Sequence, residues 1–171
     1  MAIRVATLDK LSRGSTIKIA AHNAHEKSKQ VADYVCNGEN DLDIFMQAIA
    51  ELVSVGGGTL ELSEGKFQLI SDESTELEIQ NDITIKGQGT ATKIQLTDVS
   101  IWVYEGNTGF RDLKLSCFPD FPIYYRGGGH HFLDNVQIGS MKGIDYFNAD
   151  SNDILLINGC TFSCGDKCVY T

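Results

Sequence analysis

Three aspartates in the second half of the chain are the side chains best suited to acid–base chemistry. Glycoside hydrolysis uses two carboxyl groups that flank the scissile bond, and the candidates on expected outward or turn positions are Asp134, Asp145 and Asp153. Asp112 and Asn135 stand at equivalent positions, but an asparagine cannot act as the second acid. Aspartates at turns more often accept backbone hydrogen bonds. The sequence therefore leaves the catalytic residues unassigned, and an enzymatic role is less expected than a non-enzymatic one.

Aromatic side chains indicate a second kind of chemistry, contact with sugar rings. Rings that point outward on neighbouring strands would form a strip along the surface, whereas rings that point inward would belong to the core. Aromatic ladders are also ordinary β-sheet packing, so both interpretations stay open. The candidates for glycan binding are Trp102, Tyr104, Tyr124, Tyr125 and Tyr146.

Three cysteines near the C-terminus follow one another at intervals that could suit a metal. Cys160, Cys164 and Cys168 could supply thiolates to zinc, with His130 or His131 as a fourth ligand. The alternative is that Cys160 faces the core, while the other two are turn thiols or form a disulfide. We favour this alternative and expect the histidines to be an exposed turn pair. Neither a metal nor a cofactor is predicted.

The composition limits the class of protein that carries these residues. The 171 residues are 42% hydrophobic, which is enough for one folded domain with a core. A formal net charge of −9 argues against nucleic acid as a partner. No apolar run is long enough to predict a membrane span, and none follows Met1 as a secretory signal requires. We therefore expect a cytosolic protein or one that is released by lysis, as virion proteins are.

The chain divides into an arm over residues 1–15, a helical region over 16–58 and a β-rich region over 59–171. Residues 16–20 alternate in the manner of a strand. Residues 26–35 place their apolar side chains on one helical face, which predicts a first helix.

A second helix is expected over residues 42–53, where apolar side chains recur at three- and four-residue spacing. Asn40 or Asp41 would cap its first backbone amides, and the glycines at 56–58 would end it. Three acidic side chains fall outside the apolar stripe and are expected to face water: Asp41, Asp43 and Glu51.

Beyond residue 58 the helical period disappears and a repeat of β-rich runs begins. Runs at 59–62 and 66–69 come first, and the acidic segment 72–78 is expected to be a solvated loop. Segments with the pattern small-polar, apolar, polar, apolar then begin at positions 82, 112, 135 and 159, so their spacings are 30, 23 and 24. A second series of strands falls between them at Ile101, Ile123, Ile144 and Val169.

Two strand families with one shared period predict a solenoid of stacked coils. A β-sandwich needs no such period, and the leucine-rich consensus is absent. Alternation within each strand predicts two inward stacks. The first is Ile83, Leu113, Val136 and Cys160, and the second is Ile85, Leu115, Ile138 and Phe162.

Four segments resemble the start of pectate-lyase-superfamily β-helix proteins. They are residues 32–38 (ADYVCNG), 43–49 (DIFMQAI), 56–67 (GGGTLELSEGKF) and 82–89 (DITIKGQG). The sequence departs from the usual pattern at Ser63-Glu64, where the family customarily has Leu-Pro or its like. Many proteins with this module are phage tail spikes or fibres, commonly homotrimers, and others are polysaccharide lyases or hydrolases.

The resemblance covers about residues 16 to 97 and, with the repeat, predicts a mainly β fold. We expect a short right-handed parallel β-helix of about four coils, with an N-terminal α-helical cap. The resemblance implies a structural component of a viral (phage) tail spike or fibre, located in the virion tail. It also implies a homotrimer that contacts other virion tail proteins and host surface polysaccharide.

The alternative function is that of a polysaccharide-degrading enzyme, or its N-terminal fragment. The last predicted strand reaches Thr171 without a cap, so we expect either a longer protein or a partner chain over that end.

Overall fold

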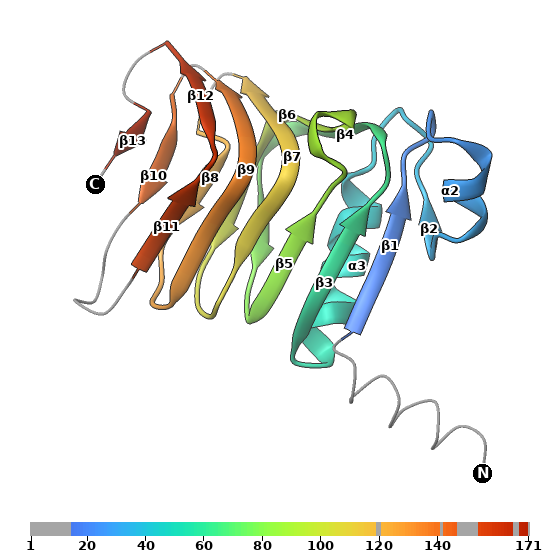
Figure 1. Ribbon diagram of the computed structural model, residues 1–171, viewed down its shortest axis with the longest axis horizontal. Coiled ribbons are helices and arrows are strands. Elements are labelled where there is room, and N and C mark those ends of the chain that lie inside the picture. The colour runs from blue at the N-terminus through green and yellow to red at the C-terminus, as the bar shows by residue number, and fades with distance from the viewer. Residues whose placement is uncertain (1–14, 119–120, 141, 147–153, 166–167, 171) are drawn as a thin grey trace.

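The computed structural model describes residues 15–118, 121–140, 142–146, 154–165 and 168–170 (Figure 1). The predicted arm, apart from Ser15, lies outside these residues, as does the candidate Asp153. The chain forms a parallel β-solenoid of about four turns with a short helical region at its N-terminal end. The mainly β class and the coil count predicted from the repeat are therefore confirmed.

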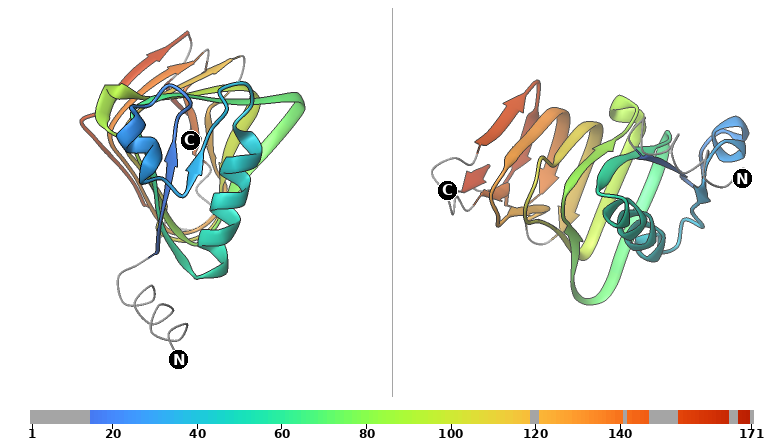
Figure 2. Two further views of the ribbon diagram at one scale, coloured as in Figure 1. Left: turned by 90° about the vertical axis from the view of Figure 1, so that its right-hand side faces the viewer. Right: turned by 90° about the horizontal axis from the view of Figure 1, so that it is seen from below.

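The solenoid has three faces around one core, as the end view in Figure 2 shows. The first face contains β1 (Ser15–Ala20), β3 (Gly57–Leu62), β5 (Asp82–Lys86), the first halves of β7 (Gly109–Phe118) and β9 (His130–Ser140), and β11 (Ile154–Asn158). The second face contains the first halves of β4 (Gly65–Ile79) and β6 (Thr92–Val103), the second halves of β7 and β9, and β12 (Thr161–Cys164). The third face contains the second halves of β4 and β6, then β8 (Ile123–Tyr125), β10 (Ile144–Tyr146) and β13 (Val169–Tyr170).

The first predicted helix is much shorter than expected. α2 spans only Glu26–Gln30, and β2 (Tyr34–Val35) pairs in parallel with β1 instead of extending the helix. Backbone hydrogen bonds from Asp33 N to Lys18 O and from Cys36 N to Ala20 O, both 2.9 Å long, hold this segment at the edge of the sheet. The expectation of a helix over 26–35 is therefore wrong after residue 30, because sheet pairing overrides the weak local helical pattern.

The second predicted helix is confirmed as α3 (Leu42–Ser54), and it buries the expected apolar stripe against the first coil. Asn40 Oδ1 accepts from Leu42 N at 3.0 Å, so Asn40 supplies the side-chain cap. Asp41 does not face water as expected, because it is fully buried. Its carboxylate accepts hydrogen bonds from Gly38 N (3.1 Å) and Gln68 N (2.9 Å), which compensates for the burial of its charge.

Inward side chains stack from coil to coil. In one coil, the strand register places a different residue in the stack from the one that the sequence alignment predicted. The strand register extends the stack of Leu115, Ile138 and Phe162 through Ile94, and not through Ile85. Ile85 belongs to the first face, in a column with Leu60, Phe110, Leu133 and Ile157. The alignment was wrong at this coil because a two-residue alternation does not indicate which face a strand joins.

The acidic segment expected as a loop is part of β4. The register shifts between Ile70 and Thr75, so the intervening residues bulge out, and pairing with β6 resumes through Ile79. Leu77 and Ile79 are buried between exposed glutamates, which is strand alternation.

The bend between the first and second faces is made by polar residues in the left-handed backbone region. Asp112 and Asn135 have φ angles of 53° and 54°, which Asp and Asn adopt more readily than most residues. Asn135 Nδ2 donates to Asp112 Oδ1 at 2.7 Å, so the corner repeats from one coil to the next. Asp112 therefore has the turn-forming role that the sequence favoured.

No helix among the described residues is long and apolar enough to cross a membrane, and the longest, α3, has 13 residues.

Candidate functional site

The aromatic candidates separate into two groups on the third face. Trp102 and Tyr124 are register partners that point outward. Tyr125 is fully buried and Tyr146 nearly so, because they occupy the inward positions of β8 and β10. The prediction that Tyr125 and Tyr146 belong to an exterior glycan-binding strip is therefore wrong, since strand alternation places both rings in the core.

The outward rings form a stacked cluster. The centroids of Trp102 and Tyr124 lie 4.8 Å apart with an interplanar angle of 19°, which matches the spacing of neighbouring strands. Tyr104 lies beside Trp102 at 6.2 Å and 31°. The indole N–H of Trp102 donates to Ser100 Oγ at 3.1 Å, so its polar atom is already hydrogen-bonded within the strand. We call Trp102, Tyr104, Tyr124 and Arg126 the third-face cluster.

Arg126 covers this cluster with its guanidinium group. The Cζ atom lies 5.2 Å from the centroid of Trp102 and 4.8 Å from that of Tyr124, which are cation–π distances. Its Nη2 atom is 2.6 Å from Asp145 Oδ2, and its Nη1 atom donates to Tyr125 O at 3.1 Å. The carboxylate of Asp145 therefore orients Arg126.

A hollow of about 330 Å³ opens at the end of this cluster, where β4, β6 and β8 turn into the next coil. Tyr104 and Arg126 form one part of its lining, and Gln80, Asn81 and Glu105 supply amide and carboxylate groups. Desolvation, followed by the carboxylates of Glu76 and Glu78, raises the pKa of Tyr104. Its hydroxyl is therefore a protonated hydrogen-bond donor at neutral pH. The hollow combines one aromatic face with several planar polar groups.

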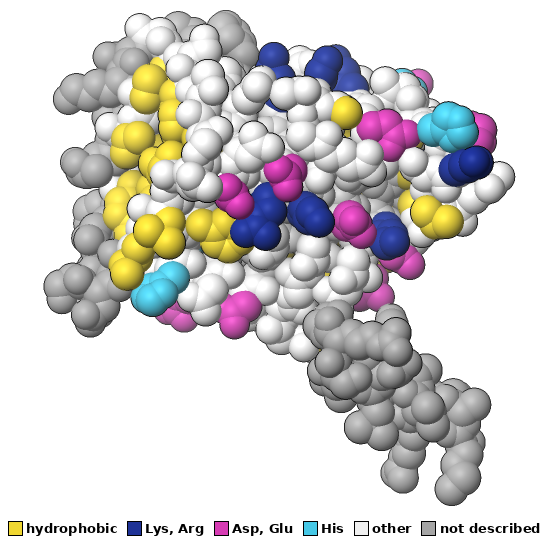
Figure 3. All heavy atoms as spheres, viewed as in Figure 1, with side chains coloured by type: hydrophobic (Ala, Val, Ile, Leu, Met, Phe, Trp, Pro, Cys, Tyr) yellow, Lys and Arg dark blue, Asp and Glu magenta, His cyan; other side chains and the backbone are white. Residues whose placement is uncertain are grey.

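A row of charged side chains crosses the first face (Figure 3), and the strand register places Asp134 in such a row, beside Arg111. Arg111 Nε is 3.0 Å from Asp134 Oδ2, and Asn158 Nδ2 donates to Asp134 Oδ1 at 2.9 Å. Both carboxylate oxygens are thus engaged. The register aligns this row as Lys18, Glu61, Lys86, Arg111, Asp134 and Asn158.

The catalytic candidates are not brought together as a pair. Asp134 points outward from the first face, whereas Asp145 points outward from the third face and is bound to Arg126. Asp153 lies outside the described residues. The two described candidates therefore lack the facing arrangement that a two-carboxylate hydrolase requires.

Arg111 occupies an environment that parallels that of Arg126. Its Cζ atom lies 5.4 Å from the ring centroid of Phe132, and it pairs with the aspartate of the next coil. The Phe132 ring fills the space in which a Cβ atom on Gly109 would stand, 2.2 Å from the nearest ring carbon. The two faces thus carry the same arginine–aromatic–aspartate arrangement, but only Arg126 borders the hollow.

Cysteine and histidine residues do not assemble a metal site in the described part of the chain. The five cysteines, all among the described residues, are not joined in disulfides. Cys160 packs against the core with its thiol donating to Asn158 O at 3.3 Å. Desolvation, and then the neighbouring Cys168, raise the pKa of Cys164 to about 11, so this thiol is protonated at neutral pH.

The two histidines are not an exposed pair. His130 is exposed, but His131 is buried with its ring 4.9 Å from that of Tyr125. The expectation fails for His131 because β9 begins at His130, and alternation then points the next side chain inward.

Sequence reasoning missed Arg126, Gln80, Asn81 and Glu105 as members of this site. Arg126 follows Tyr124 by two residues, so strand alternation could have placed both on one surface. The other three come from turns of preceding coils, and only the register of the third face brings them to Arg126.

No protein-family model, curated protein or solved structure matches this chain.

Proposed function

We propose that this chain is a structural module of a viral (phage) tail spike or fibre, of the right-handed pectate-lyase-like type, and that its third face binds a neutral saccharide. The parallel solenoid with a helical N-terminal region supports the structural part, together with the residues that resemble β-helix proteins. The observation that carries the binding part is the third-face cluster beside its polar hollow.

The chemistry of the cluster suits a sugar. A saccharide ring has apolar C–H faces and a rim of hydroxyl groups, so it needs a flat apolar surface and hydrogen-bonding side chains side by side. Tyr104 supplies a ring, and Arg126, Gln80 and Asn81 supply donors and acceptors at the hollow. At about 330 Å³, the hollow is at the small end of the range for ligand pockets, which indicates a short saccharide.

The surrounding charges favour a neutral saccharide over an acidic one. Glu76, Glu78 and Glu105 stand close to the cluster, and the charge of Arg126 is balanced by Asp145. A polymer of uronic acids would meet this negative potential, which repels anions.

Binding is expected to be weak for a single site, because an open hollow buries little of its ligand. A homotrimeric spike would present three copies, and simultaneous attachment would raise the overall affinity without new contacts. The proposed homotrimer and the proposed saccharide contact therefore reinforce each other.

The experiment uses Trp102, the chain's one tryptophan, as its reporter. Neutral oligosaccharides, amino sugars and uronic-acid oligosaccharides are titrated while the intrinsic fluorescence is followed. We expect a saturable change with a neutral sugar and none with the uronic acids. Arg126→Ala should weaken binding at least about fivefold, since it removes a charge-assisted donor.

Arg111→Ala is the matched control, because it also removes an arginine that covers an aromatic ring and pairs with an aspartate. It should leave the titration unchanged. An equal loss of binding in both variants would contradict the assignment to the third face. A titration without any saccharide response would contradict the binding function while leaving the structural role intact.

A further inference from the structure

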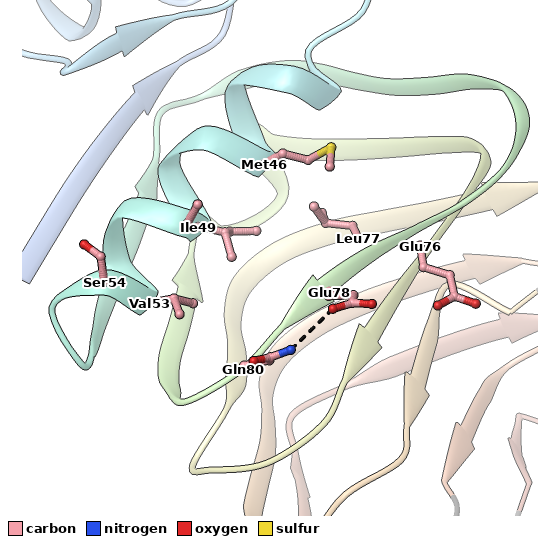
Figure 4. A pocket seen from close by; sticks show the side chains of 9 residues that line it. Met46, Ile49, Val53, Ser54, Glu76, Leu77, Glu78 and Gln80 are labelled. Atoms are coloured by element: carbon pink, nitrogen blue, oxygen red, sulfur yellow. Dashed lines mark hydrogen bonds between the residues drawn. The ribbon is translucent and has the colours of Figure 1, made fainter.

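An apolar groove of about 490 Å³ separates α3 from the second half of β4 (Figure 4). Met46, Ile49 and Val53 line it from the helix, and Glu76 and Glu78 line it from the strand. Met46 and Val53 remain partly open to solvent, although their neighbours on α3 are packed against the core.

The strand side of the groove is a sheet edge. Among the described strands, β4 pairs only with β6, and on its other side α3 stands where the strand of a preceding coil would lie. A strand edge without a strand partner can accept another extended segment through its backbone amide and carbonyl groups. The groove therefore offers apolar contacts, acidic side chains and a strand edge that no described strand pairs.

We propose that residues 1–14 of the same chain dock in this groove. This segment contains Ile3 and Val5 on either side of Arg4, so apolar side chains alternate with a basic one. It also carries Lys10 and Arg13 against the single acidic residue Asp9. The apolar side chains fit the surface of α3, and the basic side chains complement Glu76 and Glu78.

The start of β1 is close enough for this docking. Ser15 is the register partner of Gly58, which in turn pairs with Ile83, so Ser15 lies two strand spacings, about 10 Å, from Ile83. Gln80, at one end of the groove, precedes Ile83 by three residues. Fourteen residues can extend about 45 Å, so the whole groove lies within reach of the segment.

Docking would complete the first coil on its open side. It would cover the exposed edge of β4, bury the apolar side of α3 that faces the groove and neutralise part of the acidic surface beside the third face. The N-terminal segment would then be a component of the solenoid cap.

Amide hydrogen exchange on the full chain, read by mass spectrometry, tests this proposal. Peptides that cover residues 1–14 and 75–80 should both be protected, and residues 1–14 should exchange at least about tenfold more slowly than the same sequence as a free synthetic peptide. Exchange of residues 1–14 at the rate of the free peptide would overturn the proposal.

Met46→Asp places a charge in the groove, and Val55→Asp is its matched control. The two side chains are 45% and 46% exposed, but only Met46 lines the groove. Met46→Asp should abolish protection of residues 1–14 and reduce protection of residues 75–80 to the level that pairing with β6 alone provides, whereas Val55→Asp should leave both unchanged. The same loss in both variants would overturn the proposal, because it would indicate a general effect on α3.

An exchange of charges provides a second test of the docking proposal, and this test does not alter the apolar side chains of the groove. Glu78→Lys should reduce protection of residues 1–14, and adding Arg4→Glu should restore it. Failure of this rescue would overturn the proposed charge pairing between residues 1–14 and the acidic side of the groove. Protection that disappears on dilution together with a fall in solution mass would place the segment in a neighbouring copy and overturn docking in the same chain.

Discussion

Asp41 shows how one side chain can join two elements that the sequence separates. It stands at the start of α3, yet its carboxylate accepts from Gly38 N in the preceding turn and from Gln68 N in β4. Asp41 is fully buried and its two donors lie on partly buried residues, so removing the carboxylate leaves both amides without their protein acceptor. Asn40 meanwhile caps the helix itself, so the two neighbouring residues have different tasks.

Asp41→Ala should therefore reduce the free energy of unfolding by about 2–4 kcal/mol, since two partly buried backbone amides lose a charged acceptor. Urea denaturation followed by circular dichroism measures this change. Asp43→Ala, an exposed change in the first turn of α3, should cost no more than about 0.5 kcal/mol. Similar losses in the two variants would contradict the structural role given to Asp41.

At the scale of elements, α2 is held by a residue at which the sequence departs from the β-helix pattern. Glu64 Oε1 accepts from His25 N at 2.7 Å, and both of its carboxylate oxygens accept from Ser28 Oγ. Ser63 Oγ accepts from Ala21 N at 3.0 Å, directly after the end of β1. Ser63 and Glu64 thus tie the helix to the first coil, which a Leu-Pro pair would not do.

The stability of α2 should consequently depend on pH. The hydrogen bond from the His25 amide is the main cause that lowers the pKa of Glu64. A carboxyl group with a lowered folded pKa stabilises the fold above its unfolded value of about 4.3, and this contribution is lost as the pH falls through the folded pKa.

Amide exchange of Glu26–Gln30 between pH 7 and pH 3, corrected for intrinsic rates, should show the helix opening at low pH. Glu64→Gln should open it at all pH values and remove the pH dependence. Equal protection of α2 at pH 7 and at pH 3 in the wild-type protein would contradict the role given to the Glu64 carboxylate.

For the whole molecule, the two ends of the solenoid differ in how their apolar side chains are covered. At the N-terminal end, α3 packs over the first coil. At the other end, the described part of the last coils leaves apolar side chains open to solvent. Figure 3 shows them as a hydrophobic area over β9 and β11. These side chains include Ile154, Leu156, Ile157 and Val169. An apolar area of this kind is typical of a surface that contacts another chain.

If the proposed homotrimer forms, light scattering over a range of protein concentration should give the mass of three chains. Leu156→Asp, at a side chain 61% exposed near the C-terminal end, should shift the protein toward monomer. Val31→Asp, at a side chain 67% exposed near the N-terminal end, should leave the mass unchanged. A monomeric wild-type protein would contradict the proposed homotrimer and the multivalent binding that depends on it. It would favour a binding domain that acts as a single copy.

Periodicity in the sequence was sufficient to determine the solenoid, its coil length and α3. These properties are local, because a two-residue or a 3.6-residue alternation places side chains in or out within a single element. The same alternation was enough to predict that Leu113 and Val136 face the core side by side.

Only the tertiary structure decided which strands share a face and what their outward side chains meet. Ile85 joined Phe110 instead of Leu115, His131 turned inward, and Arg126 came to lie over Trp102 from the preceding coil. Such contacts depend on the register between coils, which alternation leaves undetermined because every half-buried strand has the same pattern. The fold class can therefore be predicted from the sequence, whereas the candidate site forms only when the coils stack in register.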